Sequence, residues 1–353
     1  MHETQDILFE RRGSAGIVTF NRPKALNAIT HAMVRALAHK LDDWAQDREV
    51  TRVIVTANGD RAFSAGGDIR ALYDLGKAGR QDEALAFFRD EYRLNAAIKR
   101  YPKPYVSLID GIVMGGGVGL SLHGSHRVAG DRYAFAMPEV GIGFFPDVGG
   151  TYALPRLAGE IGTYCALTCG RLKAADAVLA GAATHHVHSG RFAALLEALC
   201  GADPVNAVLA DFMATPGPGE AMPMRRAIDR CFSPDRIEDI LSALMHLAGT
   251  GNDQSQWAAD MVQTIRRQSP TSLKLALAQM RYGRQHSFED CMAAEFRIVS
   301  RVIYGHDMYE GVRAVIVDKD NAPRWSPATL DEVSDTMIDS YFETLPQGEL
   351  AVS

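Results

Sequence analysis

Short apolar runs typical of strands alternate with longer stretches of helical spacing through the first half of the chain. Gly16 to Phe20, Val53 to Val55 and Tyr105 to Ile109 are rich in β-branched or aromatic residues, and turn signals such as Asn58-Gly59 follow them. Thr30 is a candidate N-cap, because the apolar residues after it recur on one helical face. Those residues are Met33, Leu37, Leu41 and Trp44. This alternation predicts an α/β fold with layers of strands and helices.

From about residue 201 the pattern changes. A loop-rich segment that contains Thr215-Pro216-Gly217-Pro218-Gly219 leads into mostly helical spacing. We therefore predict a catalytic core over residues 1–200 and a mostly helical C-terminal region over residues 201–353 that completes the fold.

The composition is that of an ordinary globular protein, with 47% hydrophobic and 23% charged residues. The formal net charge of -6 argues against a general nucleic-acid-binding protein. No apolar run approaches the roughly 20 residues that span a bilayer. The N-terminal segment MHETQDILFERRG resembles neither a signal peptide nor a transit peptide. We therefore expect a cytoplasmic protein that binds neither membranes nor nucleic acid.

Two carboxyl groups lie in an unusually apolar segment, AMPEVGIGFFPDVGG, at residues 136–150. No Lys, Arg or His lies between or beside Glu139 and Asp147. A carboxyl group that lacks water and a basic partner has a raised pKa, which suits proton transfer or nucleophilic attack near neutral pH. The alternative is that both acids cap a loop, with Asp147 starting a turn before Gly149 and Gly150.

Two glycine clusters each follow a predicted strand, FSAGGDIRAL at 63–72 and GIVMGGGVGLSL at 111–122. Neither has the G-x-G-x-x-G spacing of a dinucleotide-binding loop or the Gly-Lys-Ser/Thr of a Walker A loop. Glycines expose backbone N–H groups, and two such donors aimed at one oxygen form an oxyanion hole. We predict this role, with one N–H from each cluster at a helix N-terminus. Close helix packing is the alternative explanation for the glycines.

The cysteines and histidines predict no metal site. The 5 cysteines are scattered, unlike a disulfide framework, and Cys165 and Cys169 would share a helix face as small buried residues. His185, His186 and His188 are close in sequence, but no Cys, Asp or Glu nearby completes a ligand set. We expect a solvated loop there.

An ordered set of motifs resembles the crotonase (enoyl-CoA hydratase/isomerase) superfamily, and within it the 3-hydroxyisobutyryl-CoA hydrolase family. One glycine-rich motif would be weak, but these motifs extend nearly from end to end. They are NRPKALNA (21–28), FSAGGDIR (63–70), RDEYRLN (89–95), KPYVSLIDGIVMGGGVGLS (103–121), AMPEVGIGFFPDVGGTYALPRL (136–157), SPTSLKLAL (269–277), AEFR (294–297) and GHDMYEGVRAVIVDKDNAPRW (305–325).

The resemblance implies a right-handed superhelix of ββα units with a helical C-terminal region. It also implies an acyl-CoA substrate, no separate cofactor because CoA is part of that substrate, and a chain that can form a homo-oligomer. It places the oxyanion donors at the N–H groups of Gly67 and Gly116. The substrate-binding residues that it implies are Glu91, Lys24, Ala25, Ala65 and Ile69, and basic groups such as Arg22 would meet the phosphates. From the sequence alone, Glu91 between Arg89 and Arg93 also fits a helix-surface charge.

One position separates two kinds of chemistry within this superfamily. Its hydratases add water with two glutamates. The resemblance aligns the first of these with Gly119, and a glycine can neither give nor take a proton. The second corresponds to Glu139, and the hydrolase pattern adds Asp147. We therefore expect a thioester hydrolase that converts 3-hydroxyisobutyryl-CoA to 3-hydroxyisobutyrate and CoA in valine catabolism. The alternatives are an enoyl-CoA isomerase that uses Glu139 alone and a non-catalytic acyl-CoA-binding protein.

Overall fold

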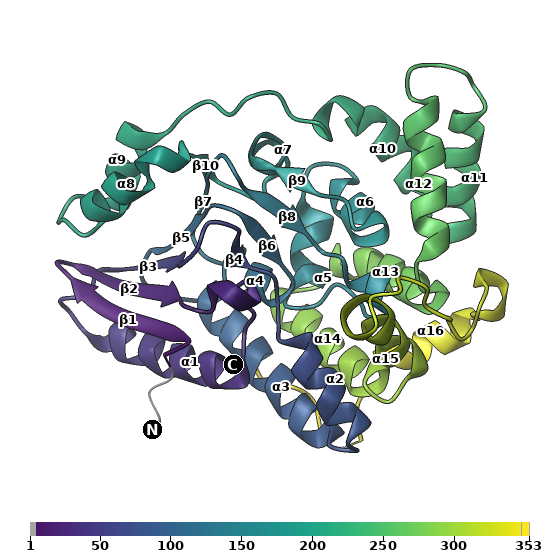
Figure 1. The fold of residues 1–353 in the computed structure, drawn as a ribbon, viewed down its shortest axis with the longest axis horizontal. Coiled ribbons are helices and arrows are strands. Elements are labelled where there is room, and N and C mark those ends of the chain that lie inside the picture. The colour runs from purple at the N-terminus through teal and green to yellow at the C-terminus, as the bar shows by residue number, and fades with distance from the viewer. Residues whose placement is uncertain (1–4, 347, 353) are drawn as a thin grey trace. The chain divides into compact units, whose positions relative to one another are not determined.

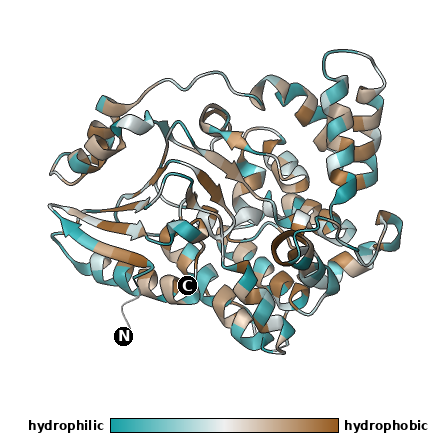
Figure 2. Ribbon diagram, in the orientation of Figure 1, coloured by the Kyte–Doolittle hydropathy of each residue, from teal (hydrophilic) through white to brown (hydrophobic). Residues whose placement is uncertain are grey.

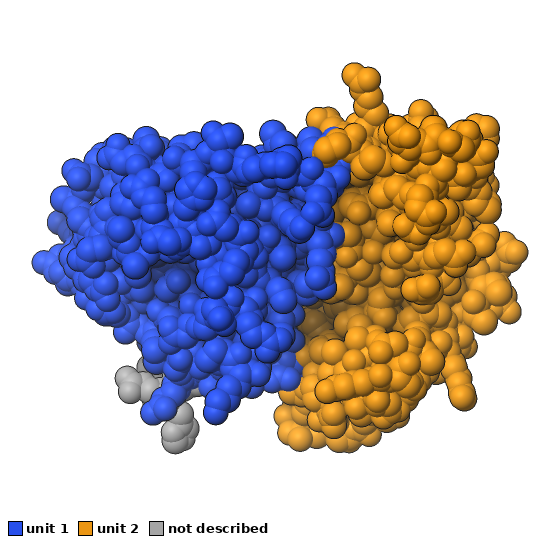
Figure 3. Space-filling view, turned by 45° about the horizontal axis from the view of Figure 1, so that its top comes forward, with its two compact units in different colours: residues 1–68, 90–136, 171–222 blue, residues 69–89, 137–170, 223–353 orange. Residues whose placement is uncertain are grey.

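The computed structural model describes residues 5–346 and 348–352 of the chain. It contains two compact units that interleave along the sequence, blue and orange in Figure 3. Unit 1 comprises residues 1–68, 90–136 and 171–222, and unit 2 comprises residues 69–89, 137–170 and 223–353. The predicted boundary between residues 1–200 and 201–353 divides the sequence and not these compact units, and it stays a prediction.

Unit 1 contains a six-stranded sheet with the order β1-β2-β3-β5-β7-β10 (Figure 1). β1 pairs with β2 in antiparallel fashion, and the other neighbours are parallel. The strands predicted from their β-branched residues are confirmed as β2, β3 and β5. The strands of this sheet are β1 Ile7–Arg12, β2 Ala15–Phe20, β3 Arg52–Ala57, β5 Tyr105–Ile109, β7 His126–Ala129 and β10 His185–His186.

A second sheet of unit 1 has four strands in the order β4-β6-β8-β9. They are β4 Ala62–Ser64, β6 Ile112–Met114, β8 Ala134–Ala136 and β9 Leu172–Lys173. Consecutive strands alternate between the two sheets. The six-stranded sheet takes β3, β5 and β7, and the four-stranded sheet takes β4, β6 and β8 in the same order. With helices between the pairs, the chain coils through repeated ββα turns, which confirms the predicted fold class.

The helices of unit 1 flank these sheets and close its hydrophobic core. Ile17, Ile54 and Val106 of the six-stranded sheet pack in one buried cluster with Leu195 and Leu209. This burial of apolar area is the main source of stability for the unit. The helices are α1 His31–Gln46, α4 Gly116–Gly119, α7 Ala174–Ala180, α8 Phe192–Leu199, α9 Val205–Phe212 and, from residue 90 on, α3 Gln81–Lys99.

Unit 2 is helical in its described residues, apart from loops and short 3-10 or π-helical turns. Its long helices are amphipathic, and in Figure 2 α11 and α12 carry both brown and teal along their length. Besides the start of α3, the α-helices of unit 2 are α2 Ile69–Lys77, α5 Gly150–Ala153, α6 Ile161–Thr168, α10 Arg225–Phe232, α11 Ile237–Ala248, α12 Ser255–Arg267, α13 Pro270–Gly283, α14 Phe288–Val302, α15 His306–Val312 and α16 Asp335–Phe342. The expectation of a mostly helical sequence after residue 201 is thus confirmed.

Thr30 caps helix α1, as its sequence predicts. The Thr30 hydroxyl accepts a hydrogen bond from the backbone N–H of Met33 at 3.3 Å. The apolar face that begins with Met33 is buried. The cap thus satisfies one of the N–H groups that a helix start leaves without an intrahelical partner.

Replacement of Thr30 by Ala should lower the free energy of unfolding by about 1 kcal/mol, because that N–H loses its acceptor. Thr30→Ser retains the hydroxyl and is the matched control. Urea denaturation followed by circular dichroism measures both variants. Equal stability of the Ala and Ser variants would contradict a capping role.

Candidate active site

The two glycine clusters meet in unit 1. β4 and β6 are parallel neighbours, so the segments that follow them leave the sheet at the same edge. A Cβ atom built on Gly116 would lie 3.1 Å from the backbone nitrogen of Gly67 and 2.6 Å from Oε1 of Glu91. The structure therefore brings the two predicted oxyanion residues together, and any side chain at Gly116 would fill the space between them.

The backbone of both clusters needs glycine. Gly66 has a φ of 109° and Gly115 a φ of 45°, which L-amino acids with side chains rarely adopt. Gly116 begins a helix of only 4 residues. The predicted helix N-terminus is therefore a single turn, and its dipole adds little to the attraction for negative charge.

Glu91 lies on the buried side of α3. Its side chain is 2% exposed, and Oε1 points toward Gly116. The alternative of a helix-surface charge is therefore wrong. The signal against it is helical spacing, since the buried residues Phe87 and Phe88 lie three and four positions before Glu91.

The residues predicted to hold CoA lie around the first glycine cluster. Lys24 and Ala25 are exposed in a 3-10 helix at Pro23–Ala25. This helix is tied to the cluster by a hydrogen bond from the Ala65 N–H to the carbonyl of Leu26, at 2.9 Å. Ile69 begins α2 in unit 2.

Arg22 is engaged in unit 1 and is a poor phosphate ligand. Its guanidinium lies 3.2 Å from Asp68 and 3.5 Å from Asp6, and it donates a hydrogen bond to the carbonyl of Ala28. A phosphate would have to displace these carboxylates. Exposed Lys24 is the better candidate.

The predicted acids Glu139 and Asp147 are both buried in unit 2, at 6% and 5% exposure. Glu139 begins a 3-10 helix, and its Oε2 has no hydrogen-bond partner among the described residues. Burial raises the pKa of Glu139 well above its usual value, and the charges of Asp147 and Glu295 raise it further. The raised pKa expected for Glu139 is confirmed in direction. The expected turn is present too, and a hydrogen bond from the Gly150 N–H to the Asp147 carbonyl closes it.

Glu295 is a third buried acid, which the sequence analysis did not single out. It lies on α14, is 0% exposed, and accepts hydrogen bonds from the N–H groups of Gly149 and Thr151. Burial and the charge of Asp147 raise the pKa of Glu295 to about 8. A helical wheel could have found it, because Met292, Phe296 and Val299 place position 295 on the apolar face of the helix.

The histidine segment differs from the expected solvated loop. His186 belongs to β10 and is buried, and Asp131, distant in sequence, reaches both His186 and His188. The ring nitrogens and one Asp131 oxygen lie within 4.8 Å of one another, close enough to hold a metal ion. The expectation that no acid completes this set is therefore wrong. Hydrogen bonds between Asp131 and the two imidazoles account for the same geometry.

The two neighbouring cysteines do not share a helix face. α6 ends at Thr168, and Cys169 follows it with a φ of 55°. That prediction is wrong because the chain leaves the helix one residue early. Cys165 is buried, as expected.

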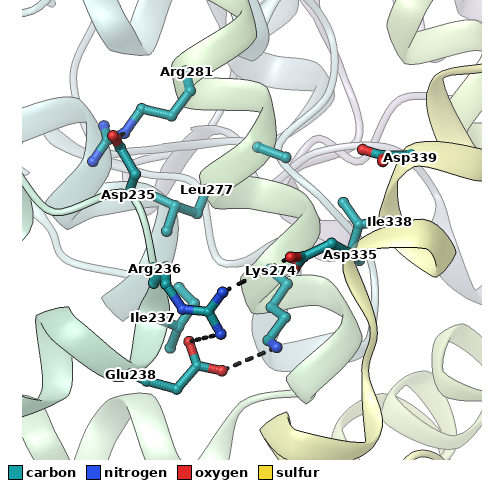
Figure 4. Close-up of a pocket in the computed structure, with 11 residues that line it drawn as sticks. Asp235, Arg236, Ile237, Glu238, Lys274, Leu277, Arg281, Asp335, Ile338 and Asp339 are labelled. Atoms are coloured by element: carbon teal, nitrogen blue, oxygen red, sulfur yellow. Dashed lines mark hydrogen bonds and ion pairs between the residues drawn. The ribbon is translucent and has the colours of Figure 1, made fainter.

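One cavity in unit 2, of about 170 Å³, lies among charged side chains and contains none of the predicted site residues. Figure 4 shows Glu238 between Lys274, at 2.9 Å, and Arg236, at 3.6 Å. Arg236 also faces Asp335 at 3.8 Å. Most of these charges are paired within the cavity wall, and we assign it no role in the reaction.

Comparison with known proteins agrees with this geometry. The family model described as enoyl-CoA hydratase/isomerase matches residues 15–342. The chain is 44% identical to mitochondrial 3-hydroxyisobutyryl-CoA hydrolase of Gallus gallus, over 98% of this chain and 90% of that protein. Identity to the Homo sapiens protein of the same name is 41%, again over 98% and 90%.

Two solved structures share the fold almost completely. A carnitinyl-CoA dehydratase from Mycobacterium thermoresistibile has a TM-score of 0.91 at 42% identity and covers 99% of each chain. An enoyl-CoA hydratase from Rhodobacter sphaeroides 2.4.1 has a TM-score of 0.91 at 36% identity, over 98% of this chain and 100% of that one.

The expectation of a cytoplasmic protein is contradicted, because the curated relatives are named as mitochondrial. It rested on the lack of a membrane-spanning apolar run and on the N-terminal residues, of which residues 1–4 lie outside the described part. Among the described residues, no helix is both long and apolar enough to cross a membrane. The ββα fold, the paired glycine clusters and the match along nearly the whole sequence show that the chain belongs to the enoyl-CoA hydratase/isomerase family.

Proposed function

We propose that this chain is a thioester hydrolase that converts 3-hydroxyisobutyryl-CoA and water to 3-hydroxyisobutyrate and CoA, a step of valine breakdown. The observation that carries the proposal is the pair of buried carboxyl groups, Glu139 and Asp147. The resemblance aligns Gly119 with a position where hydratases of the family have an acid. The names of relatives at 41–44% identity support the same substrate.

In the proposed reaction, the thioester carbonyl accepts hydrogen bonds from the N–H groups of Gly67 and Gly116. As the carbonyl carbon becomes tetrahedral, negative charge develops on its oxygen, and two fixed donors stabilise that charge. The proximity of Gly116 to the nitrogen of Gly67 supports this oxyanion hole. Glu91, buried against Gly116, would contact the acyl group.

Glu139 would either attack the carbonyl carbon and form an anhydride, or remove a proton from the attacking water. In both routes the C–S bond breaks, one water oxygen enters the acid, and the thiolate leaves. Asp147 would give the leaving sulfur its proton. Buried acids that interact share protons as a set, so an ionised Glu139 beside a protonated Asp147 fits both roles.

CoA itself would lie along the backbone around Lys24, Ala25, Ala65 and Ile69, with the Lys24 ammonium near a phosphate. The exposure of Lys24 and Ala25 beside the first glycine cluster supports this placement. The reaction needs no separate cofactor, since CoA belongs to the substrate. Assembly of several copies into a homo-oligomer stays a prediction.

A dehydratase is the competing function, because a structure at 42% identity is titled a carnitinyl-CoA dehydratase. A dehydratase removes water from the acyl group and leaves the thioester intact. Incubation with 3-hydroxyisobutyryl-CoA, with free thiol followed by a thiol reagent, separates the two. Thiol release equal to acid formed supports the hydrolase, whereas an unsaturated CoA ester without thiol supports the dehydratase.

Replacement of Glu139 by Gln should lower thiol release by at least about 10²-fold, because the amide can neither attack nor take up a proton. Binding of the CoA ester should change little, since shape and burial are retained. Steady-state kinetics and calorimetric titration measure the two quantities. Glu343→Gln, at an exposed site, is the matched control. Near-normal turnover in the Glu139 variant would remove Glu139 from the mechanism.

The pH dependence follows from the raised pKa of Glu139. Because Glu139 acts in its ionised form, kcat/KM for thiol release should still be rising with pH where an exposed glutamate, with a pKa of about 4.3, is already ionised. The spontaneous hydrolysis of the ester is measured and subtracted at each pH. A rate that is already constant at roughly pH 5 would contradict a raised pKa for the working group.

Gly116→Ala should abolish most of the activity without unfolding the chain. The added methyl group would enter the space beside Glu91 and the Gly67 nitrogen, where the carbonyl oxygen is proposed to bind. Loss of one oxyanion interaction typically costs about 10²- to 10³-fold in kcat. Gly190→Ala is the control, because nothing lies within 4 Å of its Cβ. Equal activity of both variants would exclude Gly116 from the oxyanion hole.

A further inference from the structure

The turn that carries Asp147 has a backbone conformation that needs support. Val148 has a φ of 52° and Gly149 a φ of 84°, so two successive residues are in the left-handed region. Such a conformation is unfavourable for a β-branched valine and persists only where the surroundings hold it. The hydrogen bond from the Gly150 N–H to the Asp147 carbonyl, at 2.7 Å, closes the turn. What holds the turn in place must come from outside it.

Glu295 of α14 holds one side of this turn. Its two carboxyl oxygens accept separate hydrogen bonds, one from the Gly149 N–H at 2.8 Å and one from the Thr151 N–H at 2.9 Å. A carboxylate can accept both, because each oxygen is an acceptor. An amide of the same shape has only one acceptor oxygen. The arrangement therefore uses a property of glutamate that glutamine lacks.

Helix α13 holds the other side. The amide group of Gln279, which is fully buried, donates to the carbonyl of Pro146 at 2.9 Å and to the hydroxyl of Thr151 at 2.7 Å. One helix thus binds the residues on both flanks of the turn, and the other binds its backbone N–H groups. Asp147 lies between these fixed points.

Glu295 also affects the ionisation of the proposed catalytic residue Glu139. The titratable groups that interact with Glu139 or Glu295 include Asp147, Cys169 and Cys291. These three are acidic groups or thiols, which do not neutralise a carboxylate. The charge of Glu295 adds to the rise in the pKa of Glu139.

We infer that Glu295 is a positioning residue, which holds Asp147 in its reactive place by binding the backbone of the turn on both sides of Gly150. The inference rests on the proposed function to the extent that Asp147 must act in thioester hydrolysis. It gives the C-terminal helices a defined task in the reaction. Glu295 itself touches no reacting atom and acts through Asp147.

The test is Glu295→Gln, with Glu289→Gln on the exposed face of the same helix as the control. We expect kcat for thiol release to fall on the order of 10²-fold, because the side chain at position 295 loses one of its two hydrogen bonds to the turn and Asp147 shifts. KM should change little. Because both hydrogen bonds to the turn need the ionised carboxylate, the wild-type kcat should also keep rising through the Glu295 pKa of about 8, and the variant should lack that part of the rise. A structural role alone would change the unfolding midpoint but leave that pH profile in place.

Wild-type activity in both Glu295→Gln and its control would overturn the inference, and so would a reduced kcat with an unmoved pH profile. If the variant does not fold, the amide signals of Gly149 and Thr151 in the wild-type protein provide the readout. In a nuclear magnetic resonance titration they should shift together, with a midpoint at the Glu295 pKa of about 8. Independent or absent shifts would also overturn it. If the wild-type chain releases no thiol, the proposed function fails, whereas the amide titration still tests whether Glu295 holds the turn.

Discussion

The burial of Glu139, Asp147 and Glu295, which interact within one helical unit, is the constraint on which the chemistry of this protein depends. An ionised carboxylate is poorly stabilised away from water, and the charge of Asp147 raises the pKa of both Glu139 and Glu295. The N–H groups of Gly149 and Thr151 offset part of this rise for Glu295. Glu139 and Glu295 therefore retain protons at pH values where exposed glutamates have lost them. Groups in this state can both take up and give a proton during one reaction.

Local patterns in the sequence predicted the parts of the fold and site that local chemistry decides. The β-branched run at Tyr105–Ile109 becomes a strand with those bounds, and Thr30 caps its helix. Glu139 and Asp147 could be identified because the apolar residues around them are neighbours in the chain. The glycine clusters could be identified for the same reason, since Gly66 and Gly115 need backbone angles that other residues rarely adopt.

Features that depend on contacts between distant segments could not be found in this way. Glu295 reaches Gly149 across 146 positions of the sequence, and Asp131 meets His186 across 55. Glu91 lies between two arginines, which favours a surface charge, although it shares a helix face with Phe87 and Phe88; its packing against Gly116 shows that it is buried. Parallel strands bring Asp131 near His186, and helix packing brings Glu295 to its turn, but residue spacing along the chain does not record which segments meet. The periodicity of α14 was the one available signal for Glu295.

The most direct test of this account is the protonation state of Glu139 itself. Infrared difference spectra between the wild-type protein and Glu139→Gln isolate the carboxyl stretch of this residue at each pH. The account predicts a protonated carboxyl band that persists at about pH 6, where an exposed glutamate is fully ionised, and that disappears as the pH rises further. Absence of that band at about pH 6 would show that Glu139 is an ordinary acid, and would contradict the role assigned to its burial.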